Sequence, residues 1–349
     1  MAAYTAFVES LSRLFAAQYR VQNIFSRQNG EFFGNFNDVS ADLYGSAAWH
    51  FCACRIFYDK PKIRKIQRYR LGGAMLKALT LTRYHIYYTI TQSKFWAAVL
   101  MILSAGYINV NGAAQIVFDY NTPISFGVFA LIFSGPFFVT VMIVALLFIF
   151  SEMPFKNSQQ IFLLTRSGKR TWCISQIFFI ISVSLFVLMV ILLETLLFFG
   201  FQISFDNSSW GKVIMSIYNA GLGSKYEVQF IGGAPYEAIL AVTPLQALAY
   251  VLPMVFMLSV TLGLVVFTVN MAAGSSLGIV VGGVFTALNL FTSYFQTATF
   301  FRLSPVSWIK LNAVKLLPFK LYPIIVYVTA SAAAICATLI KCRKHSDII

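Results

Sequence analysis

Long apolar blocks separated by short polar connections fill most of this 349-residue chain from residue 95 onward. A helix that crosses the hydrocarbon core of a bilayer takes about 20 apolar residues, and each block is of about that length. Pro136 is expected to kink the second block. The pattern predicts transmembrane helices at about 95–112, 126–150, 173–201, 244–269, 276–300 and 321–340.

The segment just before the first block, residues 76–94, predicts a helix of a different kind. Its apolar face is broad but interrupted by Lys77, Arg83 and Lys94, and it carries several Tyr residues. Tyr is enriched at the level of the lipid headgroups. We therefore expect an all-α membrane protein with about six transmembrane helices and an N-terminal interfacial helix.

Residues 1–74 are unlike the rest, because they mix Asn, Ser, Gly and Arg with aromatics and contain a basic run at 55–70. Two interpretations stay open. The segment is a cytosolic arm close to anionic headgroups, or it is not part of the native protein. The second follows from Met75, which begins a start-like sequence, and from Gly72-Gly73, whose codons resemble a ribosome-binding site. In both cases we expect residues 75–345 to form the membrane domain without it.

Composition supports the membrane assignment. Hydrophobic residues make up 58% of the chain and charged residues 11%, against roughly 45–50% and about 25% in soluble domains. The net charge is +14, but the basic residues lie beside apolar blocks, where the positive-inside rule explains them. We therefore expect no nucleic-acid partner.

The distribution of Lys and Arg predicts the orientation. The connection 151–172 and the C-terminal tail are basic and fall on the same side as the N-terminus, so both termini should be cytosolic and 202–243 outside. The segment 301–320 disagrees, since it is basic but predicted outside. A re-entrant or interfacial helix, or a wrong span count, would explain it.

Few residues have the pattern of a chemical site. Glu194 is the only carboxylate in a predicted span, which makes it a candidate for contact with a cationic substrate or for proton relay. We favour the structural alternative, a Glu hydrogen-bonded to a neighbouring helix or protonated. His50, Cys52 and Cys54 lack a second ligand pair at zinc spacing, so no metal is expected.

The sequence lacks the motifs of a phosphate-binding loop and of a zinc protease. Neither GxxxxGK[ST] nor HExxH occurs in the chain. We expect neither enzymatic activity nor a cofactor. Gly278 and Gly282 form a GxxxG pattern, which predicts close packing between helices or between protomers.

The connection after the second span, FSEMPFKNSQQIFLLTRSGKRTWCISQ at 150–176, combines an acidic residue, an apolar step and a basic cluster. This order predicts a short cytosolic helix that rests its apolar side on the membrane and leaves its polar side for a partner. The alternative is a basic loop without a partner. The same order resembles the type 2 ABC exporter permeases over residues 75–345. Glu152, Leu163-Leu164-Thr165 and Arg170 match that pattern, whereas Lys156-Asn157-Ser158-Gln159 differs from the Gly-Thr step of many members.

The resemblance implies a permease subunit in a bacterial cell membrane. Two such subunits, as a homodimer or heterodimer, would surround a path for a hydrophobic or peptide-like substrate, and separate ATP-binding cassette ATPases would drive it. The alternative function is a membrane sensor or assembly protein that binds a partner without transport. The residues implied for coupling to the ATPase are Glu152, Lys156, Gln160, Leu163, Leu164, Arg166, Lys169 and Arg170.

Overall fold

The computed structural model describes residues 74–154, 163, 166–200, 202–273, 277–295, 298–313, 317 and 321–344. The chain divides into two units, residues 1–70 and 71–349, and every described residue belongs to the second. The two interpretations of the N-terminal segment therefore concern residues that lie almost wholly outside the described ones.

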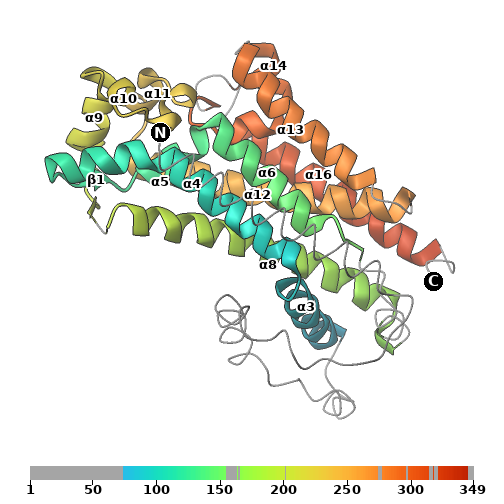
Figure 1. The fold of residues 1–349 in the computed structure, drawn as a ribbon. Helices are drawn as coiled ribbons and strands as arrows, with labels where there is room; N and C mark the ends of the chain where they lie inside the picture. Colours follow the sequence, from blue (N-terminus) through green and yellow to red (C-terminus); the bar gives the residue numbers. More distant parts are fainter. Residues whose placement is uncertain are drawn as a thin grey trace, which may run out of the picture. The chain divides into compact units, whose positions relative to one another are not determined.

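Helices dominate the described residues (Figure 1). The elements of the membrane domain proper are α3 (Ala74–Ile90), α4 (Ser93–Tyr120), α5 (Val128–Leu131), η2 (Ile132–Ser134), α6 (Pro136–Phe150), α8 (Lys169–Phe198), α12 (Pro244–Ala273), α13 (Leu277–Phe295) and α16 (Tyr322–Lys344). Helix α3 covers most of the segment for which an interfacial helix is predicted.

Among the described residues, four helices are long and apolar enough to cross a membrane: α4, α8, α12 and the part of α16 up to Cys342. A fifth span results if α5–η2 and α6, which meet at an angle of 81°, count as one. The apolar part of α13 runs only from Leu277 to Ser293, about 26 Å at 1.5 Å per residue, which is shorter than a core of about 30 Å. The predicted class of multi-pass membrane protein is confirmed, whereas the count of six spans is not.

The kink expected at Pro136 is a complete break in the helix. Gly135 is extended, and Pro136 begins α6 in the first-turn position that suits its missing N–H. Asn109 Nδ2 of α4 donates to the Ile132 carbonyl at 3.0 Å, and Asn289 Nδ2 of α13 donates to the Pro136 carbonyl at 3.0 Å. Neighbouring helices thus satisfy backbone groups that a lipid environment would leave without partners.

The GxxxG glycines of α13 serve packing inside the chain. A Cβ on Gly278 would meet Asn270 Oδ1 and the Val266 carbonyl of α12, and a Cβ on Gly282 would overlap the Leu147 side chain of α6. At Gly278 the neighbour includes a backbone carbonyl, so only glycine allows this close approach, whereas a larger residue at Gly282 would require the Leu147 side chain to shift.

A small folded cap lies at one end of the helices, around α9, α10 and α11 (Figure 1). It comprises α9 (Gly211–Asn219), α10 (Leu222–Lys225), η3 (Gln229–Gly233) and α11 (Tyr236–Leu240). Beside it the strands β1 (Ile124–Ser125) and β2 (Ile203–Ser204) pair in parallel. This short sheet joins the connection after α4 to the connection after α8, and among the described elements it is the exception to the predicted all-α class.

The described part of the basic segment 301–320, residues 301–313, packs against the bundle. It includes the end of α14 (Ala298–Leu303) and all of η4 (Pro305–Ile309). Lys310 follows η4, is only 5% exposed, and donates from Nζ to Ser293 Oγ at 2.9 Å. Burial lowers the pKa of Lys310 to about 8. Lys310 is therefore buried and is not a loop charge in solvent. This removes part of the conflict between the basic segment 301–320 and the predicted orientation. Lys315 and Lys320 lie outside the described residues.

Candidate functional site

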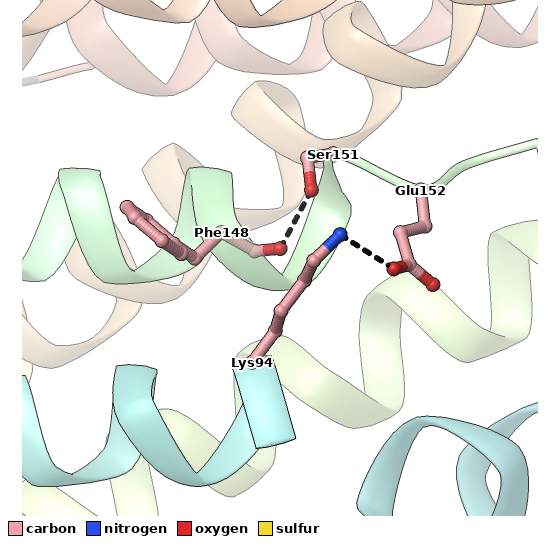
Figure 2. Close-up of polar contacts among 4 residues, drawn as sticks. All are labelled: Lys94, Phe148, Ser151 and Glu152. Carbon is pink, nitrogen blue, oxygen red and sulfur yellow. Dashed lines mark hydrogen bonds and ion pairs between the residues drawn. The ribbon is translucent and has the colours of Figure 1, made fainter. Parts of the chain in front are cut away.

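The chain leaves α6 at a point held by two polar contacts. Ser151 Oγ donates to the Phe148 carbonyl at 2.8 Å, which closes the last turn of the helix. The next residue, Glu152, accepts from Lys94 Nζ at 2.8 Å (Figure 2). Lys94 lies in the first turn of α4, so the ion pair joins the start of α4 to the end of α6. Both side chains are partly exposed, at 55% for Lys94 and 27% for Glu152.

The following residue, Met153, is held by a different helix, α12. The Met153 carbonyl accepts from Asn270 Nδ2 of α12 at 2.6 Å, and Asn270 Oδ1 accepts from the Gly278 amide of α13 at 2.7 Å. Asn270 was not predicted as a site residue. The available signal was a single amide near the end of an apolar block, four residues before the small residues 274–276.

The last turns of α16 lie at the same end of the bundle. Lys341 Nζ donates to the Ala272 carbonyl of α12 at 2.6 Å, where a cation interacts favourably with the C-terminal end of the helix dipole. Cys342 of α16 and Cys173 of α8 lie side by side. Several helix ends therefore meet in one region: the start of α4, the end of α6, the start of α8, the end of α12 with the start of α13, and the end of α16.

Three of the residues predicted for coupling, Lys156, Gln160 and Leu164, lie outside the described residues. Leu163 is partly buried and packs against the hydrophobic core. Arg166 and Arg170 are exposed and Lys169 is partly buried. An open depression of about 420 Å³ lies here, lined by Gly168, Lys169, Arg170, Thr171 and Cys342. This arrangement presents positive charge at the start of α8.

Helix α3 attaches to the beginning of α8 through buried polar side chains. Thr82 Oγ1 donates to the Ser175 carbonyl at 3.1 Å, and Gln176 Nε2 lies 2.9 Å from Nε2 of the fully buried His85. An amide nitrogen only donates, so the His85 Nε2 accepts and the ring is neutral with its proton on Nδ1. Burial lowers the pKa of His85 to about 4. The α3–α8 contact is thus made with a histidine that has to stay uncharged.

Glu194, the other predicted candidate, lies within α8 away from the loop. It is 5% exposed, and neither carboxyl oxygen has a hydrogen-bond partner among the described residues. The carboxyl packs directly on Gly106 of α4, where a Cβ would overlap it. The Tyr107 backbone amide lies nearby without forming a hydrogen bond of good geometry. The structure does not bring Glu194 together with the other predicted site residues.

No group of three or more His, Cys, Asp or Glu side chains that would suit a metal ion occurs among the described residues. No family model matches the chain, and no curated protein or solved structure matches it. The residues and their arrangement are therefore the basis for the functional proposal.

Proposed function

We propose that the chain is the permease subunit of an ABC exporter, which moves a hydrophobic or peptide-like substrate with energy from ATP hydrolysed by a separate subunit. The observation that carries the proposal is the arrangement of the segment 151–154. Glu152 is bound to α4, and Met153 is bound to Asn270 of α12, which in turn bonds to Gly278 of α13. A partner that displaced this segment would act on three helices at once.

The surroundings of the segment suit a docking partner in the cytosol. Exposed Arg166 and Arg170 and the open depression at Gly168–Thr171 form a basic surface, consistent with a cytosolic face. On this proposal α3 lies in the membrane interface, both termini are cytosolic, the cap of α9–α11 is outside, and α13 completes six spans. Two copies, or this chain and a related one, enclose the substrate path.

The test is purification of the full-length, tagged chain from the membranes of the source organism. An ATPase that carries a GxxxxGK[ST] loop should co-purify, with vanadate-sensitive ATP hydrolysis. Glu152→Lys should lower the amount of ATPase recovered about ten-fold or more, because a charge-assisted contact is worth about 1.5–3 kcal/mol.

Glu237→Lys is the matched control, since it makes the same charge change on an exposed residue of α11 in the cap. Recovery of the ATPase with this variant should equal that of the wild type. If the wild-type chain brings down no ATPase, the permease assignment is wrong, and a membrane sensor or assembly protein that binds a different partner replaces it.

A further inference from the structure

Asn270 bonds to two segments that are remote from each other in sequence. It is 3% exposed and lies in the last turn of α12. Its Nδ2 donates to the carbonyl of Met153, and its Oδ1 accepts from the amide of Gly278 at the start of α13. The first amides of a helix have no partner within the helix, so this one side chain satisfies an orphan donor of α13 and an acceptor in the loop.

The start of α13 has little room to move independently of Asn270. A Cβ on Gly278 would lie 2.6 Å from Asn270 Oδ1 and 2.7 Å from the Val266 carbonyl, closer than atoms can pack. The backbone of α13 is therefore seated directly on α12 at this point. By contrast, a Cβ on Gly283, five residues further along, would meet nothing within 4 Å.

The two anchors of the 151–154 segment differ in how well they transmit a displacement. The Lys94–Glu152 pair is partly exposed, so water and ions compete for both charges and the pair breaks and reforms easily. The Asn270 bonds are buried, and separating them would leave polar groups without partners in an apolar surrounding. A displacement of the segment is accordingly passed on through Asn270 more rigidly than through Lys94.

We infer that Asn270 is the positioning residue that passes movement of the 151–154 segment to α13, by holding the Met153 carbonyl and the Gly278 amide on one rigid side-chain amide. This inference rests on the proposed function, in which the ATPase moves that segment. It adds that α13, the short apolar helix, is the element that responds.

The experiment uses the full chain with its co-purified ATPase in lipid nanodiscs. The native cysteines are first replaced. Spin labels are then attached to cysteines introduced at two exposed positions, Leu185 of α8 and Val284 of α13. The distance between the labels is measured without nucleotide and after trapping with ATP and vanadate. Asn270→Leu removes both hydrogen bonds at similar side-chain volume. Gly278→Ala disturbs the same link from the side of α13 and leaves Asn270 in place.

Both variants should lose the ATP-dependent change in distance while recovering as much ATPase as the wild type. The matched controls are Gly283→Ala on α13 and Thr268→Val on α12, whose hydroxyl bonds within α12 and to α16; both should keep the wild-type change. A wild-type change in distance in Asn270→Leu and Gly278→Ala overturns the inference. Absence of an ATPase from the wild-type preparation is a separate result, seen before any variant is compared, and counts against the proposed function itself.

Discussion

The ammonium group of Lys94 donates to the carboxylate of Glu152 at 2.8 Å, across 58 residues of sequence. Glu152 was predicted to face a partner, yet it already has one inside the chain. Its two possible roles, holding α4 and contacting an ATPase, can be separated by exchanging the two charges.

The exchanged double variant Lys94→Glu/Glu152→Lys rebuilds the ion pair but reverses the charge that a partner would meet. Because the pair is partly exposed, we expect the unfolding free energy to change by no more than about 1 kcal/mol. Association with the ATPase should remain as weak as in Glu152→Lys alone. Pull-down of the ATPase and thermal unfolding of the same preparations check both statements. Full recovery of association in the double variant would show that Glu152 acts only through Lys94.

Glu194 should limit stability. Its two buried oxygens lack partners among the described residues, and removing such groups spares a penalty of about 1–3 kcal/mol. Glu194→Leu should therefore raise the unfolding temperature in detergent, whereas Gly106→Ala should lower it because the new methyl overlaps the carboxyl. Gly283→Ala is the control for helix propensity. A lower unfolding temperature in Glu194→Leu would mean that the carboxyl has a partner after all.

Loss of ATP-driven transport in a stabilised Glu194→Leu protein would favour the functional interpretation of this residue. Unchanged transport would favour the structural one. The readout is ATP hydrolysis stimulated by substrate in the same nanodiscs.

The attachment of α3 to α8 should weaken in acid. Burial lowers the pKa of His85 from 6.5 to about 4. Between these two pH values His85 is protonated when α3 is detached from α8 and neutral when it is attached. The stabilisation is fully present above pH 6.5 and is lost as the pH falls from 6.5 toward 4, by about 3 kcal/mol in total.

Hydrogen exchange of the α3 amides tests this pH dependence. After correction for intrinsic rates, exchange at pH 5.5 should be roughly ten-fold faster than at pH 7.5. His85→Gln keeps an acceptor for Gln176 without a titrating group and should abolish the difference. A difference that persists in this variant would assign the pH dependence to another group.

Cysteine labelling of intact cells tests the orientation. A membrane-impermeant maleimide should reach Ser208→Cys, which is exposed in the connection before α9, and should not reach Ser167→Cys, which lies just before α8. The native cysteines are replaced first, because Cys336 is free and exposed. Labelling of Ser167→Cys in place of Ser208→Cys would reverse the predicted topology.

The positions of the apolar blocks, and therefore the membrane class and most helix boundaries, were determined by the sequence alone, because the length and charge content of a span depend on local composition. The sequence also marked Pro136 as a point of irregularity, but only the structure shows that the helix breaks there, since Pro253 lies inside the continuous helix α12. The sequence also located Glu152 and Glu194, since a charge beside or within an apolar block stands out without knowledge of its neighbours.

Only the tertiary structure decided which groups those charges meet. Lys94 with Glu152, Gly106 with Glu194, and Asn270 with both Met153 and Gly278 are contacts between helices far apart in sequence. Which face of a uniformly apolar helix points inward is settled by close packing and by the need to pair buried polar groups, and composition carries little information about either. For the same reason Lys310, which looked like a misplaced loop charge, is a buried ammonium group bonded to Ser293.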